Sequence, residues 1–274
     1  MTRTPATEPR AHCTAAADGT LTWLLDPPAA TAPALVLTRR RKQGREQAPG
    51  DERTLPLTPT PEGGRRAVLP PEPPLAEGRW DTWALLDDGT RHRLRPGLRD
   101  LRLLTEGAAR DRPSPVAVRI PYPTKDGYLA LRTWLRTAHA EAETLRVTPG
   151  TMTVRARLHG ATTGPGAAVL LRERAHGAVR ELEPTRRTDQ EIEFTVGYAA
   201  LFDEGKEAAR GRVLDVFVRP RQGADRVRVG RLLDDLADRK AVSVYPAATV
   251  HGTAVRPYFT VDNDLALDVG GAAV

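Results

Sequence analysis

The pentapeptide Asp-Gly-Thr-Leu-Thr at Asp18–Thr22 returns as Pro-Gly-Thr-Met-Thr at Pro149–Thr153, and this return decides the fold. Three further blocks recur in the same order, and their offset grows from the 131 residues of the first block to 136 residues. Small insertions in the loops between matched strands produce such a drift, whereas chance similarity does not keep its order over four blocks. The chain is therefore predicted to contain two copies of one unit. The further pairs are Ala34–Leu37 with Ala168–Leu171, Gly78–Trp83 with Gly211–Phe217, and Val118–Leu131 with Val255–Leu267.

Each copy shows the two-residue period of β-structure. Apolar side chains alternate with threonine and arginine in Thr151–Leu158, and Glu191–Val196 alternates in the same way. Turn signals such as Asp88-Gly89 separate these runs at the 8–12-residue spacing that is typical of sandwiches and barrels. We therefore predict an all-β fold, a tandem duplication of immunoglobulin-like antiparallel β-sandwiches with short helices.

The expected organisation is a disordered arm at 1–11, a first sandwich at 12–135 and a second sandwich at 136–274. The loop Arg41–Arg53 is also expected to be disordered, because it is polar and charged. Short helices are expected in three places: Leu135–Thr144, Ala199–Ala209 and Leu232–Lys240.

Composition excludes several classes of protein. The chain has 274 residues, of which 41 are basic and 35 acidic, and its net charge is +6. The single cysteine, Cys13, excludes an intramolecular disulfide scaffold and cysteine-rich metal modules. No run approaches the roughly 20 apolar residues of a membrane span, and Met1–Ala17 lacks the apolar core of a signal peptide. We expect a cytoplasmic protein that reaches a membrane, if at all, through a partner.

The basic residues are mostly arginine, because lysine occurs only four times. Acidic residues lie among them over most of the chain, but one cluster stands out: Arg39, Arg40, Arg41, Lys42 and Arg45. Two interpretations are open, a solvated loop at a strand end or a contact with an anionic partner. Nucleic acid is not the expected partner, since no aromatic residue lies beside the cluster in the sequence.

Two tryptophans offer a second candidate for ligand binding. Trp80 and Trp83 are an odd number of residues apart on a predicted strand, so their rings face opposite sides of the sheet. One ring is expected to enter the core, and the other to be exposed or covered by a partner. An exposed ring on a sandwich face can stack on a sugar, whereas ordinary core packing is the alternative.

The triplet Asp262-Asn263-Asp264 has the spacing at which two carboxylates can hold one divalent cation. The first copy has Asp126-Gly127-Tyr128 at the matching place, which keeps the turn residues and loses the second carboxylate. Asn and Gly both tolerate a positive φ, so a tight hairpin is the favoured interpretation and a metal site the alternative. No nucleophile elbow, phosphate-binding loop or histidine ligand motif is present, and no cofactor is expected.

The stretch Leu232–Leu267 resembles a known module. Its segments Asp235–Lys240, Val242–Pro246 and Val255–Leu265 are similar to a β-rich accessory module of actinobacterial proteins. That module resembles regions appended to family 2 glycosyltransferases and to CDP-glycerol glycerophosphotransferases of the teichoic-acid type, and stand-alone proteins similar to them are often labelled "transferase". The resemblance implies a connection with the synthesis of cell-envelope polymers, but the nucleotide-binding α/β domain of those enzymes has no counterpart here.

These observations favour a non-catalytic tandem β-sandwich protein that binds an anionic glycan or teichoic-acid-like polymer, or docks on its synthase. Arginine would form bidentate contacts with phosphate, and an exposed aromatic ring would stack on sugar. One alternative is a small glycosyl- or glycerophosphotransferase that uses Asp262 and Asp264 with a divalent cation. The other is a structural module that forms homo-oligomers through an edge strand.

Overall fold

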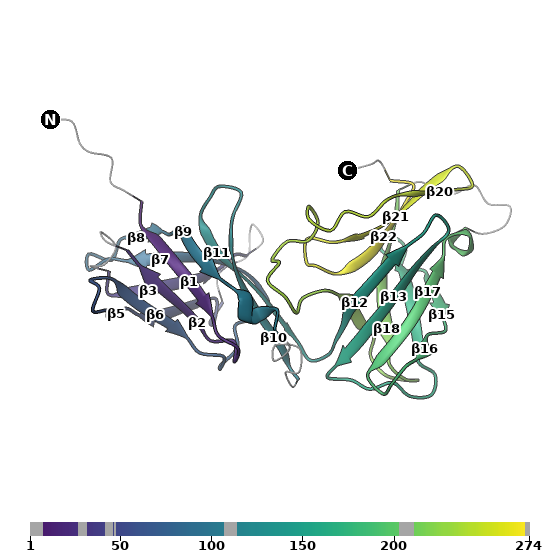
Figure 1. Ribbon diagram of the computed structural model, residues 1–274, viewed down its shortest axis with the longest axis horizontal. Coiled ribbons are helices and arrows are strands. Elements are labelled where there is room, and N and C mark those ends of the chain that lie inside the picture. Colours follow the sequence, from purple (N-terminus) through teal and green to yellow (C-terminus); the bar gives the residue numbers. More distant parts are fainter. Residues whose placement is uncertain are drawn as a thin grey trace. The chain divides into compact units, whose positions relative to one another are not determined.

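The computed structural model describes residues 8–26, 32–41, 46, 48–106, 114–202 and 211–271. The chain forms two units, each rich in strands (Figure 1). The main boundary lies between Arg136 and Thr137, one residue from the boundary expected from the sequence. Unit 1 comprises Met1–Arg112, Ala117–Arg136 and Leu233–Ala237, and unit 2 comprises Pro113–Val116, Thr137–Leu232 and Asp238–Val274.

Unit 1 contains two sheets. Their strand orders are β5-β6-β2-β1-β9 and β10-β11-β7-β3-β4, and β8 pairs with β7. A short 3-10 turn, η2, follows β9. The elements are β1 (Arg10–Ala15), β2 (Leu21–Leu25), β3 (Ala34–Arg39), β4 (Glu52–Pro56), β5 (Thr58–Pro59), β6 (Arg65–Leu69), β7 (Gly78–Leu85), β8 (Arg91–Arg93), β9 (Arg95–Asp100), η2 (Arg102–Leu104), β10 (Val116–Pro123) and β11 (Leu129–Arg136).

Unit 2 repeats this plan with one strand added at an edge. Its strands follow the order β16-β17-β13-β12-β19-β18-β22-β21-β20, and β14 lies between β15 and β18. The elements are β12 (His139–Val147), β13 (Thr151–His159), β14 (Ala168–Glu173), β15 (Val179–Leu182), β16 (Thr185–Arg186), β17 (Glu191–Gly197), η4 (Ala199–Leu201), β18 (Arg212–Arg219), β19 (Val227–Gly230), β20 (Ala248–Val250), β21 (Thr253–Phe259) and β22 (Leu265–Val269).

The two units share one pairing pattern. The pairs β1–β2, β2–β6, β3–β4, β3–β7 and β7–β11 of unit 1 correspond to β12–β13, β13–β17, β14–β15, β14–β18 and β18–β22 of unit 2. Each unit also has one parallel pair, β1 with β9 and β12 with β19. In unit 2 the single strand β19 pairs with both β12 and β18, whereas in unit 1 two strands, β8 and β9, divide these partners. The duplication seen in the sequence is therefore a duplication of topology.

Alternating residues build the core of each sandwich. In β13 the side chains of Met152, Val154, Ala156 and Leu158 are fully buried, and the residues between them are more exposed. The neighbouring strand β17 alternates in the same way, as expected from its sequence. The period of two thus places one face of each strand against the other sheet, and the all-β prediction is confirmed.

Two of the three predicted helices are wrong, and the third is a 3-10 helix of 3 residues where the structure describes it. Leu135–Thr144 forms the end of β11 and the first part of β12, because Ala140 and Ala142 face the core, both pair with β13, and Ala140 also pairs with β19. Helix propensity in this alanine- and glutamate-rich stretch is overridden by these tertiary contacts. Leu232–Lys240 consists of bends and turns, and Leu232 and Leu233 are buried without a helix. Of Ala199–Ala209, Ala199–Leu201 is a 3-10 turn, and residues 203–209 lie outside the described residues.

The segments expected to be disordered are partly ordered. Strand β1 begins at Arg10, inside the arm expected at 1–11, and residues 1–7 lie outside the described residues. Strand β4 begins at Glu52, inside the loop expected at Arg41–Arg53, and residues 42–45 and 47 of that loop are not described. The described segments contain no helix with the length and apolarity that crossing a bilayer requires.

Candidate functional site

The two predicted tryptophans lie on opposite faces of β7, as their spacing requires. Trp80 is 0% exposed, and its indole Nε1 donates to the Ala76 carbonyl at 3.1 Å and to Thr133 Oγ1 at 3.2 Å. Trp83 is half-buried on the outer face, opposite Val36 of β3. Trp80 therefore belongs to the core of unit 1, and of these two rings Trp83 is the partly exposed one.

The predicted arginine cluster divides into two parts at the end of β3. Arg39 and Arg41 both bind the carboxylate of Asp51, which is 2% exposed. The hydrogen bond from Arg41, followed by that from the Ala48 amide, lowers the pKa of Asp51 below its ordinary value. Arg39 also donates to the carbonyl of Glu77. These two guanidiniums close the loop around Asp51, whereas Lys42 and Arg45 lie outside the described residues.

Arg40 reaches the outer face of β7 and binds Asp81. Its Nε lies 3.0 Å from both carboxylate oxygens, and this hydrogen-bonded pairing raises the pKa of Arg40. Arg93 of β8 binds the same carboxylate, with Nη2 at 2.6 Å from Oδ1. One carboxylate therefore serves two guanidiniums.

Aromatic rings flank the second of these guanidiniums. The Cζ atom of Arg93 lies 4.2 Å from the centre of the Tyr128 ring and 5.6 Å from that of Trp83. Tyr128 also contacts Arg95, whose Cζ is 3.9 Å from the ring centre. Arg95 is held by Glu8 and by the Asp126 carbonyl, at 2.7 Å from Nη1. We name Arg40, Asp81, Trp83, Arg93 and Tyr128 the unit 1 cluster; at neutral pH its charged groups sum to +1.

Unit 2 repeats this arrangement at the equivalent strand positions. Asp215 of β18 binds Arg174, with Oδ1 at 2.6 Å from Nη2, and Arg228, with Oδ2 at 3.3 Å from Nη1. Arg228 lies opposite Phe217 in the β18–β19 pair, as Arg93 lies opposite Trp83 in the β7–β8 pair. Its Cζ is 4.8 Å from the centre of the Phe217 ring.

The two clusters differ at the residue after the hairpin. Where unit 1 has Tyr128 against Arg93, unit 2 has Asp264, whose Oδ2 lies 3.0 Å from Nε of Arg228. We name Arg174, Asp215, Phe217, Arg228 and Asp264 the unit 2 cluster; its two guanidiniums meet two carboxylates, and its charge is zero.

The triplet Asp262-Asn263-Asp264 forms the predicted hairpin. Asn263 has φ 58°, and its amide donates to the Thr260 carbonyl at 2.9 Å. Gly127 has φ 76° in the matching turn, and its amide donates to the Thr124 carbonyl at the same distance. Asp264 is buried against Arg228, and no group of three or more His, Cys, Asp or Glu side chains suited to a metal occurs among the described residues. The turn therefore accounts for the residue types of this triplet.

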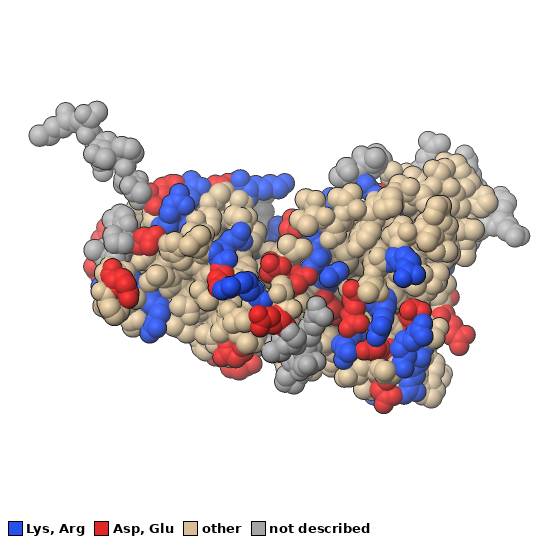
Figure 2. Space-filling model, viewed as in Figure 1, with Lys and Arg blue, Asp and Glu red and all other residues tan. Residues whose placement is uncertain are grey.

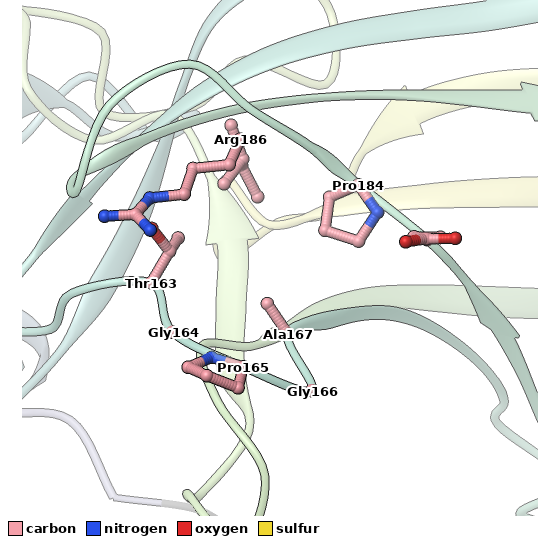
Figure 3. Close-up of a pocket in the computed structure, with 9 residues that line it drawn as sticks. Thr163, Gly164, Pro165, Gly166, Ala167, Pro184 and Arg186 are labelled. Atoms are coloured by element: carbon pink, nitrogen blue, oxygen red, sulfur yellow. The ribbon is translucent and has the colours of Figure 1, made fainter.

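A shallow cavity of about 230 Å³ lies in unit 2, beside the loop before β14 (Figure 3). The side chain of Arg186 lies beside Thr163 at its rim, and Arg186 also pairs with Asp189. None of its lining residues is aromatic, so the cavity provides no stacking platform. It is lined by Thr163, Gly164, Pro165, Gly166, Ala167, Glu183, Pro184, Arg186 and Ile192.

On the sheet face of unit 2 that carries β13 and β17, the charges neutralise one another. Figure 2 shows basic and acidic side chains interleaved over the part of unit 2 that carries β13 and β17. Arg157 binds both Glu143 and Glu191, and Arg155 binds Glu191 at 2.8 Å. Such exposed ladders stabilise a sheet face modestly and leave little charge for a ligand.

Reasoning from the sequence missed Arg93, Arg174 and Arg228 as members of a site. The signal that identifies them is the internal repeat, because aligning the copies places Arg40 on Arg174, Asp81 on Asp215 and Arg93 on Arg228.

Neither a protein-family model nor a curated protein sequence matches the chain. Solved structures that resemble it include residues 217–571 of S. aureus TarS, at 17% identity and TM-score 0.38, covering 49% of this chain and 39% of that one. A longer S. aureus TarS structure matches at 15% identity and TM-score 0.39, covering 57% and 28%. A pullulanase from Anoxybacillus sp. LM18-11, complexed with maltotriose, matches at 12% identity and TM-score 0.25, covering 85% and 26%. The chain spans less than half the length of each of these matched chains.

Proposed function

We propose that this protein is a non-catalytic β-sandwich binding protein, and that its unit 1 cluster holds an anionic, phosphate-bearing polymer of the cell envelope. The observation that carries the proposal is the sharing of Asp81 by Arg40 and Arg93 beside two aromatic rings. The assignment to the cell envelope rests on the resemblance of Leu232–Leu267 to modules of polymer-synthesising enzymes.

The charge of the cluster suits a phosphodiester. A guanidinium presents a planar set of donors that matches two oxygens of a phosphate. Asp81 occupies part of the donor sets of Arg40 and Arg93, whose side chains are 37% and 22% exposed. Because one carboxylate faces two cations, the cluster keeps a positive charge that favours an anion.

The aromatic rings of the unit 1 cluster suit the sugar or polyol units that lie between the phosphates of such a polymer. Trp83 is half-buried, and the face of an indole can stack on the C–H groups of a sugar or polyol. Arg93 lies between Trp83 and Tyr128, so the cation is oriented by the rings before a ligand arrives. A polymer that alternates phosphate with sugar or polyol would match this alternation of cation and ring.

The test is a calorimetric titration with poly(glycerol phosphate) at low and at moderate ionic strength. We expect saturable binding that weakens with salt, and a loss of about tenfold in Arg93→Gln, because one charge-assisted contact is removed. Trp83→Ala is expected to weaken binding severalfold. Dextran, a neutral polysaccharide without phosphate, is expected to bind at least tenfold more weakly than poly(glycerol phosphate).

The matched control is Arg157→Gln, which removes the same charge from the neutralised ladder of Glu143 and Glu191. It is expected to leave the affinity within twofold of the wild type. Equal losses of affinity in Arg93→Gln and Arg157→Gln would show that the net charge of the protein alone explains the interaction. Absence of saturable binding would refute the proposal and favour docking on a protein partner.

A further inference from the structure

The ring of Phe217 contacts two guanidiniums on the outer face of unit 2. The Cζ atom of Arg226 is 5.0 Å from the centre of its ring, and that of Arg228 is 4.8 Å away. Arg228 sits directly opposite Phe217 in the β18–β19 pair, and Arg226 lies two residues earlier, just before β19 begins. The strand pairing therefore sets the contact of Arg228 with the ring.

The two guanidiniums are not equivalent. Arg228 is committed to Asp215 and Asp264, and its side chain is 23% exposed. Arg226 is exposed, and within the described part of the chain its guanidinium contacts the Phe217 ring and no carboxylate. In unit 1 the equivalent residue, Arg91, is instead held by both oxygens of Glu52. Unit 2 thus presents a cation that an aromatic ring orients and that no acidic side chain neutralises.

We propose that Arg226 and Phe217 form a second anion subsite, which takes a phosphodiester of the same polymer. The inference rests on the proposed function for the identity of the polymer, and on unit 2 alone for the site. A guanidinium that contacts a ring through cation–π attraction uses none of its N–H groups in a hydrogen bond to a carboxylate, so these donors remain for phosphate oxygens. This subsite is weaker than the unit 1 cluster, because it has one ring and because Asp264 neutralises the neighbouring Arg228.

Two sites on one chain make binding depend on polymer length. A long polymer that occupies one site reaches the other at a raised effective concentration, whereas a short oligomer binds each site independently. Loss of the weaker site is therefore expected to reduce the affinity for long polymer more than the affinity for short oligomer.

The experiment follows backbone amide resonances during titration with a glycerol phosphate trimer, and measures the affinity for long poly(glycerol phosphate) in parallel. In the wild type, we expect saturable shifts in β18 and β19 of unit 2 as well as in β7 and β8 of unit 1. In Arg226→Gln the unit 2 shifts are expected to vanish, the unit 1 shifts to persist, and the affinity for long polymer to fall threefold to tenfold.

The matched control is Arg221→Gln, which removes an exposed arginine of the preceding turn. It is expected to keep the unit 2 shifts and to change the affinity for long polymer less than twofold. Inorganic polyphosphate, which lacks the polyol, separates recognition of phosphate alone from recognition of the repeat.

The outcomes separate this subsite from the proposed function. Shifts confined to unit 1, or equal effects of Arg226→Gln and Arg221→Gln, would overturn the subsite and leave the unit 1 proposal standing. Shifts confined to unit 2 would overturn the unit 1 proposal alone, and absence of shifts in both units would overturn both. Arg226 is exposed, and an unchanged amide spectrum of the free variant verifies its fold.

Discussion

Unit 1 and unit 2 carry the same arrangement of charged and aromatic side chains on their outer sheet faces, and the two arrangements differ at one position. In both, an aspartate of the central strand binds two arginines beside an aromatic ring. In unit 1 the second arginine meets Tyr128, and in unit 2 it meets Asp264. The aspartate and its arginines therefore belong to the architecture of the unit, and the residue after the hairpin decides whether the cluster keeps a positive charge.

Replacing the central aspartate of each cluster by alanine tests how much that cluster contributes to the stability of its unit. This change has the largest expected effect. Asp215 is 5% exposed; burial opposes its ionisation most strongly, but the hydrogen bond from Arg174 and the charge of Arg228 outweigh burial and lower its pKa. Asp215→Ala leaves Arg174 without its carboxylate and Arg228 with Asp264 alone, and is expected to destabilise unit 2 by about 2 kcal/mol. Asp81→Ala is expected to cost about 1 kcal/mol, since this carboxylate is more exposed.

The two losses can be measured separately. All four tryptophans lie in unit 1, so tryptophan fluorescence follows the unfolding of that unit in denaturant. Amide hydrogen exchange in β14 and β18 follows unit 2. Equal losses in the two variants would contradict the difference in burial.

Tyr128→Asp gives unit 1 the residue of unit 2, and unit 2 shows that the hairpin accepts it. The variant loses the ring that orients Arg93 and gains a carboxylate that neutralises it. Binding of poly(glycerol phosphate) in the titration above is expected to weaken about tenfold, with fluorescence unfolding changed little. Tyr128→Phe, which keeps the ring, is the control and is expected to bind like the wild type; a wild-type affinity in Tyr128→Asp would contradict the account.

Asp264→Asn makes the opposite change in unit 2 with a smaller expected effect. The amide keeps a hydrogen-bond acceptor for Arg228 but removes the negative charge. Amide shifts in β18 and β19 are expected to saturate at about twofold lower polymer concentration, because screened charges contribute modestly. A weaker response of these amides would contradict the role given to Asp264.

A pH titration separates the units through buried histidines. His139 and His159 stack at 6.5 Å in unit 2, with Glu141, Glu143 and Arg157 as the charged groups around His159; burial, followed by the charge of His139, lowers the pKa of His159. The unfolded chain then binds more protons below pH 6.5 than the folded chain, so unit 2 is expected to lose stability as pH falls below that value.

His159→Gln is expected to flatten this loss, and His176→Gln, which changes an exposed histidine, is expected to leave it unchanged. The readout is hydrogen exchange of unit 2 amides between pH 7 and pH 5, with exchange rates corrected for their intrinsic pH dependence. A stability of unit 2 that does not change between pH 7 and pH 5 would contradict the burial of this histidine pair.

The internal repeat and the alternation of apolar residues predicted the strands, because burial of one sheet face imposes a period of two. They did not predict the fate of Leu135–Thr144, where local propensity favours helix and pairing of Ala140 and Ala142 with two neighbouring strands prevails. The parity of Trp80 and Trp83 placed their rings on opposite faces without knowledge of the fold.

The sequence alone could not identify the carboxylates that the arginines bind. Arg40 binds Asp81, 41 residues away, so the fold alone brings them together. Arg39 and Arg41 look identical to Arg40 in the sequence, yet both turn to Asp51 and close a loop. A run of arginines in the sequence therefore locates the cationic side chains along the chain. The register of the sheet determines which carboxylate each of them binds.

The most direct test of the central claim follows the four tryptophan indole resonances during titration with poly(glycerol phosphate). Trp23, Trp80 and Trp134 are at most 1% exposed and serve as internal controls for Trp83. We predict that the Trp83 resonance, assigned with Trp83→Phe, shifts saturably and returns when salt is added, while the other three stay in place. A Trp83 resonance that does not move, or four resonances that move together, would contradict a polymer site on the unit 1 cluster.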